Sequence, residues 1–358
     1  MKSLFFLLSL YIFYPAIAQS NKTDIIDPEH LSYKEFRLRA QRTAPGSIHL
    51  PFEKINIIDS RFDTTKVGFI PTDIEFIHDK RNFFKKVRFK DSKSVAGAIE
   101  KYYNDYYQNS FTENGFTLLI VMKRFWVSGI DYRTAQAIDL TYNADSDDNL
   151  YCKWEYYIGK NDLYLPVKRV DTIMDTDDEL SQYLDEDFSE RRLGKFKFLL
   201  KTLIELYDFE KGINNYELKP KKSISEIRDY NEKRFDLPVL KQPILNKGVF
   251  LSYNDFKNNQ PSILNFVEKK MHYSITKAER YLTDSAGNNI NNYWGYSDGE
   301  DFRYGKYGND KIFRKGNTFQ FFVQVIFISP NVTTPVVTRN KLKVWVPYQL
   351  DMETGNIY

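Results

Sequence analysis

Hydrophobic and polar residues follow two different periods in the first half of the chain. The run GFTLLIVMKRFWVSG at 115–129 is apolar almost throughout, which predicts a strand in the middle of a sheet with both faces covered. Residues 91–107 show helical spacing instead and predict a helix packed on that strand. Its apolar positions are Val95, Ala98, Ile99, Tyr102 and Tyr106. The N-cap candidates are Asp91, Ser92 and Ser94.

Three further strands are predicted after this central run, at 134–142, 149–159 and 163–174. Short polar loops join them, as in an antiparallel meander. An alternating strand is also expected at 55–58. Residues 177–212 predict a long helix with one apolar stripe. The stripe consists of Phe196, Leu199, Leu200, Leu203, Ile204 and Tyr207.

The pattern changes after residue 213. Residues 214–247 are charged, contain three prolines, and hold one short helix opened by Ser223-x-x-Glu226, which favours a linker. Beyond it we expect a helical turn at 253–257, then strands separated by hairpin signals and ended by a terminal hairpin within 341–358. No helix of normal length is predicted after Ser262.

These elements predict an α+β fold. An N-terminal mixed or antiparallel sheet packed by two main helices is followed by a small, mainly antiparallel β domain. The expected divisions are a signal peptide at 1–18, a lead segment at 19–50 with a short helix near 31–40, an α+β domain at 51–213, the linker, and the β domain at 248–358.

The first residues have the composition of a secretory signal peptide. Lys2 precedes an apolar run shorter than the roughly 20 residues of a membrane span, and Ala16-Ile17-Ala18 suits cleavage between Ala18 and Gln19. Gln19 is not the cysteine that anchors a bacterial lipoprotein. We therefore expect an extracytoplasmic protein with no transmembrane segment after signal removal. The remaining length exceeds what one core usually serves, which favours two domains.

The composition of the chain limits the classes of partner that we expect. The chain has 51 basic and 48 acidic residues, so its near-balanced charge gives no reason to expect a nucleic-acid or anionic-membrane partner. The one cysteine, Cys152, cannot form an intramolecular disulfide and is expected to be a small buried hydrophobic residue. Aromatic residues make up 16% of the chain, an enrichment that suits pleated strands.

Gly295-x-Ser297-x-Gly299 matches the spacing of a hydrolase nucleophile elbow. No helical pattern follows it, and no histidine lies after Ser297 to complete a triad in the elbow's chain order. Asp298-Gly299 instead fits a type I′ hairpin turn in which both residues take positive φ. We therefore do not expect Ser297 to be a nucleophile.

Metal and cofactor motifs are not evident either. Asp145, Asp147 and Asn149 resemble the start of a calcium loop, but Leu150 and Tyr156 stand where glycine and glutamate are required. The four histidines show no metal-ligand spacing, and neither common phosphate-binding glycine motif is present. No metal or cofactor is expected.

Asp59 and Asp63 are the candidates for a carboxylate-dependent hydrolase, because polar residues just after a buried strand often line a crevice. In the alternative interpretation they form a strand-ending turn with Arg61 paired to an acid. Lys123 and Arg124 should lie on opposite faces of their strand, where it leaves the core.

Trp294, Tyr296, Asp301, Arg303 and Tyr304 are the candidates for a binding surface. Rings alternating with charges on short strands can present an aromatic platform to a protein or glycan. Alternatively, the rings close a thin β core and the polar residues face water.

GVFLSYNDFKNNQPSI and WGYSDG, together with the signal peptide, resemble exported proteins of unknown function from Gram-negative envelopes. The resemblance covers about the last third of the chain and implies an extracytoplasmic location, with no activity to transfer. The hypotheses that remain are a non-catalytic binding or envelope-associated protein that recognises a protein or glycan, a purely structural envelope protein, and an exported hydrolase using Asp59 and Asp63.

Overall fold

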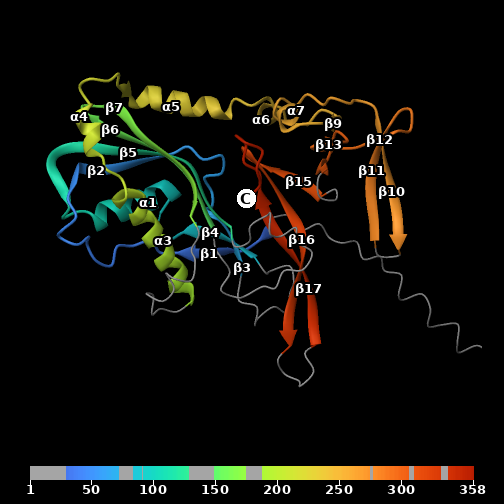
Figure 1. Cartoon of the computed structure of the whole chain (residues 1–358), viewed down its shortest axis with the longest axis horizontal. Helices are drawn as coiled ribbons and strands as arrows, with labels where there is room; N and C mark the ends of the chain where they lie inside the picture. The colour runs from blue at the N-terminus through green and yellow to red at the C-terminus, as the bar shows by residue number, and fades with distance from the viewer. Residues whose placement is uncertain are drawn as a thin grey trace, which may run out of the picture.

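The computed structural model describes residues 30–71, 84–90, 92–128, 149–174, 188–274, 277–305, 310–331 and 338–358. The signal peptide with its Ala18–Gln19 cleavage site and the strand predicted at 134–142 lie outside these ranges, as do Asp145 and Asp147. Within them the chain is a strand-rich α+β protein, as predicted, and its strands form one mixed sheet and two antiparallel sheets (Figure 1).

Residues 33–241 contain the mixed sheet and most of the helices. Their elements are β1 (Tyr33–Phe36), β2 (Leu50–Asp59), β3 (Gly68–Pro71), β4 (Phe84–Phe89), α1 (Val95–Tyr106), β5 (Phe111–Ser128), β6 (Asn149–Lys160), β7 (Leu163–Met174), α3 (Phe188–Glu205), α4 (Glu210–Asn214), β8 (Lys222–Ser223), α5 (Ile224–Glu232), η5 (Lys233–Phe235) and α6 (Pro238–Lys241).

Residues 248–349 form the two antiparallel sheets. Their elements are β9 (Gly248–Phe250), α7 (Tyr253–Lys257), β10 (Phe266–Ser274), β11 (Lys277–Asp284), β12 (Asn289–Ile290), β13 (Gly295–Ser297), β14 (Phe302–Tyr304), β15 (Asp310–Lys315), β16 (Thr318–Asn331) and β17 (Thr338–Gln349). No helix follows Ser262 within the described residues, and α7 has the predicted bounds.

β5 is the central strand of the mixed sheet, and this confirms the prediction from its apolar run. It pairs in parallel with β2 and β3 and antiparallel with β6, which continues to β7 through a two-residue turn. Asn161 and Asp162 both take positive φ in that turn, as a type I′ hairpin requires. Alternate residues of β5 enter two different cores, so both faces of the strand are covered.

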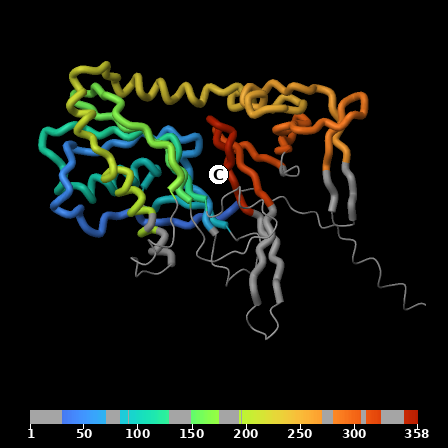
Figure 2. The backbone as a smooth tube through the Cα atoms, in the orientation of Figure 1, coloured from blue at the N-terminus to red at the C-terminus, as the bar shows by residue number. Residues whose placement is uncertain are grey.

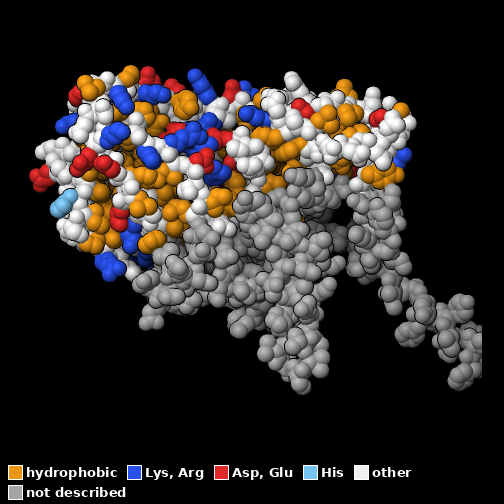
Figure 3. All heavy atoms as spheres, in the orientation of Figure 1, with side chains coloured by type: hydrophobic (Ala, Val, Ile, Leu, Met, Phe, Trp, Pro, Cys, Tyr) orange, Lys and Arg blue, Asp and Glu red, His pale blue; other side chains and the backbone are white. Residues whose placement is uncertain are grey.

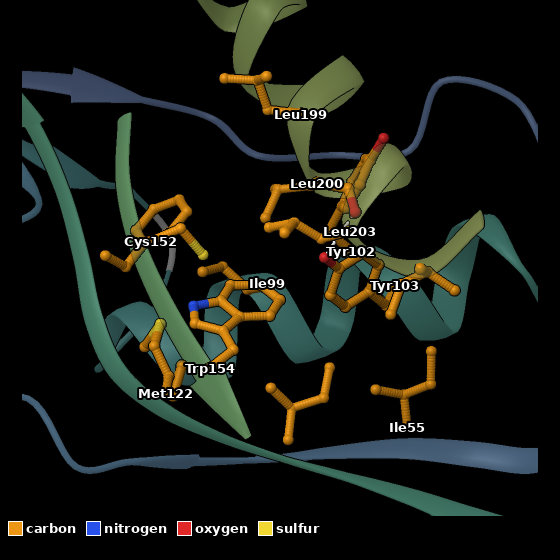
Figure 4. Close-up of a cluster of buried hydrophobic side chains, with 14 of the residues drawn as sticks. Ile55, Ile99, Tyr102, Tyr103, Met122, Cys152, Trp154, Leu199, Leu200 and Leu203 are labelled. Carbon is orange, nitrogen blue, oxygen red and sulfur yellow. Dashed lines mark hydrogen bonds between the residues drawn. The ribbon is translucent and has the colours of Figure 1, made fainter. Parts of the chain in front are cut away.

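The larger core lies between the sheet and helices α1 and α3. Figure 4 shows Met122, Cys152 and Trp154 of the sheet facing side chains of both helices. Ser94 is the N-cap of α1, accepting from the Gly97 N–H at 3.0 Å. Cys152 is fully buried, as expected, and burial raises the pKa of its thiol.

The segment predicted as a linker covers the opposite face of the sheet. Ser223 and Glu226 form the predicted capping box at the start of α5, and Ile227 packs against Leu119 and Val121 of β5. From there the chain runs along one side of the molecule to the second half (Figure 2). This segment is therefore part of the packed structure.

The C-terminal lobe, residues 248–358, consists of a six-stranded sheet, β17-β16-β15-β14-β13-β9, and the small sheet β10-β11-β12. One buried cluster combines its residues Phe250 and Phe302 with Phe69 and Trp126 of the N-terminal lobe, residues 30–214. The two lobes therefore share a hydrophobic core across their junction.

Four local predictions were wrong. The helix predicted at 177–212 is interrupted within the described residues, because α3 ends at Glu205 and α4 begins only at Glu210. Residues 33–36 form β1, paired in parallel with β4, where a short helix at 31–40 was expected. Only Gly299 takes positive φ in the β13–β14 loop, because Asp298 instead accepts from the N–H groups of Glu300 and Asp301. Lys123 and Arg124 do not mark the end of the buried strand, since Phe125, Trp126 and Val127 are also buried.

Candidate functional site

Asp59 lies at the end of β2 and is held by Arg61. The Arg61 Nε and Nη2 atoms donate to the two oxygens of Asp59, each at 2.8 Å, so the pair is bidentate. The third nitrogen, Nη1, donates to the carbonyl oxygen of Lys66 at 2.8 Å. This is the strand-ending turn of the alternative interpretation.

Asp63 lies deeper and is paired with Lys66. The Lys66 Nζ is 2.8 Å from Oδ2 of Asp63, and the two side chains are only 1% and 6% exposed. Burial alone would raise the pKa of Asp63, but the Lys66 ammonium and hydrogen bonds from Thr65 outweigh burial and lower it. Asp63 is therefore ionised at neutral pH and holds no proton for general-acid catalysis.

Further ion pairs cross the junction between the lobes. Arg124 of β5 contacts Asp171 at 2.6 Å and Asp351 at 2.9 Å. Glu353 accepts hydrogen bonds from both Lys153 of β6 and Arg234 of η5. Together Lys153 and Arg234 lower the pKa of Glu353 to about 2, although its burial acts in the opposite direction.

The predicted binding residues fall into two groups. Trp294 and Tyr304 belong to the shared core, with ring centroids 5.3 Å apart, and the Trp294 ring also lies 4.5 Å from Phe256. Tyr304 is 7% exposed and Tyr296 only 1%. The three rings therefore do not form an exposed platform, and Trp294 and Tyr304 close the β core.

Tyr296 and Arg303 belong to a second group. They are direct cross-strand partners on β13 and β14, and Lys311 of β15 is the next partner of Arg303. The Tyr296 hydroxyl donates to Glu268 at 2.8 Å, which raises the tyrosine's pKa beyond the effect of burial. A charged network thus crosses from the six-stranded sheet to the small sheet.

We call this network the Arg303 cluster. It consists of Glu268, Arg280, Tyr296, Asp301, Arg303 and Lys311. Asp301 lies 2.6 Å from Lys311 and 3.8 Å from Arg303. The side chains of all five charged members keep between 15% and 29% of their surface exposed, so each is partly accessible to solvent.

Sequence reasoning missed half of this cluster. Lys311 could have been found, because the period-two pattern of a hairpin places it opposite Arg303. Glu268 and Arg280 carry no such signal, since the small sheet reaches Tyr296 only through tertiary packing.

Ser297 is buried and is the last residue of β13, and the element that follows it is the strand β14, with which Ser297 pairs. Its hydroxyl oxygen accepts from the Gly299 N–H at 3.1 Å. This confirms that the Gly-x-Ser-x-Gly spacing does not form a nucleophile elbow.

In the part of the chain that the structure describes, no group of acidic, histidine and cysteine side chains is arranged to hold a metal ion. Within the same ranges, no helix has the length and apolar character needed to cross a membrane. Comparisons with protein-family models, curated proteins and solved structures found no match for this chain.

Proposed function

We propose that this chain is an exported, non-catalytic binding protein that recognises an envelope partner through the Arg303 cluster. The observation that carries the proposal is the arrangement of the cluster: half-buried charges of both signs fixed around a buried tyrosine. Such groups are held in place before a ligand arrives, which lowers the entropic cost of binding.

The charges of the cluster favour a polar partner of low net charge. Arg280, Arg303 and Lys311 are balanced by Glu268, Asp301 and the nearby Asp298. Burial opposes ionisation of Asp298, but the backbone N–H groups of Asp301 and Glu300, and then Arg303, lower its pKa. Hydrogen-bond donors and acceptors therefore alternate over a short distance. The half-buried rings of Tyr293 and Phe266 pack beside them and offer apolar surface. This combination suits the hydroxyl groups and apolar faces of a neutral glycan better than a polyanion.

The wider surface supports the same choice. Figure 3 shows lysine and arginine side chains mixed with aspartate and glutamate on the visible face of the described residues. Nucleic-acid binding depends on a strongly positive surface, on which lysine and arginine side chains would be grouped apart from the acidic ones.

The hydrolase hypothesis receives less support from the junction. Asp59 and Asp63 each have a cationic partner at 2.8 Å, and glycoside hydrolysis needs one protonated carboxyl group. Full activity of an Asp59→Asn, Asp63→Asn double variant on any substrate found would remove that hypothesis.

The proposal is tested by binding of residues 19–358 to an array of purified envelope glycans. Arg303→Ala should weaken binding by about tenfold or more, since a charge-assisted hydrogen bond contributes roughly 1.5–3 kcal/mol. Arg88→Ala is the matched control, because Arg88 makes a half-exposed ion pair with Glu35 in the N-terminal lobe. Equal binding by both variants, or no binding by the unmodified protein, would contradict the proposal.

A further inference from the structure

The C terminus of the chain lies at the junction of the two lobes (Figures 1 and 2). After β17 the chain turns back on itself: Gln349 and Tyr358 exchange backbone hydrogen bonds of 2.8 and 3.1 Å, and Leu350 bridges to Ile357. Gly355 takes a φ of 77° inside the turn. We call residues Leu350–Tyr358 the C-terminal turn.

Two acids of the C-terminal turn bind three cations outside the C-terminal lobe. Asp351 accepts from Arg124 of β5 at 2.9 Å. Glu353 accepts from Lys153 of β6 and from Arg234 of η5. Arg234 also donates to the backbone carbonyl of Ser60 at 2.7 Å, so Glu353 is connected to the end of β2 as well.

The terminal residue adds an aromatic contact with the same strands. The Tyr358 ring is stacked on Tyr151 at 5.5 Å and lies edge-on to Trp126 at 5.6 Å. The Arg124 guanidinium lies 5.6 Å from the centre of the Tyr358 ring. Tyr358 is buried as a result.

The C-terminal turn is also fixed to its own lobe. The Tyr253 hydroxyl of α7 donates to the carbonyl oxygen of Met352 at 2.6 Å. One short segment thus contacts β5, β6, η5 and α7, which belong to both lobes and to the segment between them.

We propose that the C-terminal turn sets the orientation of the two lobes. Interfaces between parts of one chain allow relative motion unless they are large or specifically held. Ion pairs fix orientation more narrowly than apolar contacts do, because they require particular partners at particular distances. The shared apolar core holds the lobes together, and the ion pairs of the C-terminal turn fix one orientation of the lobes relative to each other. This inference does not depend on the ligand of the Arg303 cluster.

The test measures the distance between the lobes with spin labels. Labels at Lys101→Cys on α1 and Ser285→Cys in the β11–β12 turn occupy exposed positions, while the native Cys152 is buried. The labelled chain, residues 19–358, should give one narrow distance distribution. Adding Asp351→Asn and Glu353→Gln should broaden it by about twofold or more, with an unchanged circular dichroism spectrum.

Two further variants complete the test, one as a control and one as a second way to disrupt the C-terminal turn. Glu217→Gln is the matched control, because Glu217 is 83% exposed and its ion pair with Lys221 joins two residues four positions apart; its distribution should stay narrow. A chain that ends at Gln349 should broaden the distribution at least as much as the double variant. A narrow distribution in the folded double variant would overturn the proposal, and so would loss of the folded spectrum in both altered chains, since the lobes would then be one inseparable core.

Discussion

Replacing Asp63 with asparagine is expected to destabilise the protein by about 3 kcal/mol. Asparagine has nearly the same shape as aspartate and can still accept the two hydrogen bonds from Thr65. In the structure the Thr65 backbone N–H and the Thr65 hydroxyl donate to Oδ1 of Asp63 at 2.9 and 2.6 Å. The substitution therefore removes the charge while keeping most of the local geometry. What remains is the Lys66 ammonium, 1% exposed, without the carboxylate that lies 2.8 Å away.

The magnitude follows from the burial of both partners. Breaking a buried ion pair by neutralising one member costs roughly 3–5 kcal/mol, and we take the lower end because the backbone contacts of the turn remain. A change of 1 kcal/mol shifts the melting temperature of a chain of this size by about 2 °C, so a decrease of about 6 °C is expected. The double variant Asp63→Asn, Lys66→Met removes both charges and should recover most of that loss.

Differential scanning calorimetry at pH 7 measures these shifts. Asp105→Asn is the control, because its pair with Lys101 is exposed and should contribute less than about 1 kcal/mol. A shift for Asp63→Asn no larger than the control, or no recovery in the double variant, would refute the structural role given to Asp63. Asp63 would then be available again as a functional carboxylate.

Two further outcomes are expected from single substitutions. The pKa of Glu353 is about 2 in the folded protein against 4.5 for the free side chain, so its stabilising effect is complete above pH 4.5 and is lost as the pH falls toward 2. Urea unfolding of Glu353→Gln should therefore show a smaller loss of stability between pH 5 and 2 than the unmodified protein. Ser223→Ala removes the N-cap of α5 and should lower the free energy of unfolding by about 1 kcal/mol in urea titrations at pH 7, whereas Ser285→Ala in an exposed turn should not.

Most elements of the fold could be predicted because their signals are local. The continuous apolar run of β5 requires cover on both faces, and α1 and α5 provide it. Ser223 and Glu226 mark the start of α5, since a capping box involves only residues three positions apart. The turn between β6 and β7 is equally local.

Other elements depend on partners far along the chain. Residues 33–36 have no strong period of their own, and they form a strand because β4 offers a parallel edge about fifty positions later. Likewise, Asp298 could take positive φ in isolation, but its side chain binds two N–H groups of its own loop instead.

The two candidate sites illustrate the same limit for function. The alternation of aromatic and charged residues on β13 and β14 does not reveal whether one or both faces of the sheet are covered. In the structure two separate hydrophobic clusters cover both faces. The charge partners are even less accessible to sequence reasoning: Arg124 meets Asp351, and Lys153 meets Glu353, only after the two lobes have packed. Candidate acids in a sequence are therefore better judged by which cations the fold can bring to them. By that criterion Asp59 and Asp63, each paired with a cation at 2.8 Å, are weaker catalytic candidates, while Arg303 and its neighbours Asp301 and Lys311 stay partly exposed.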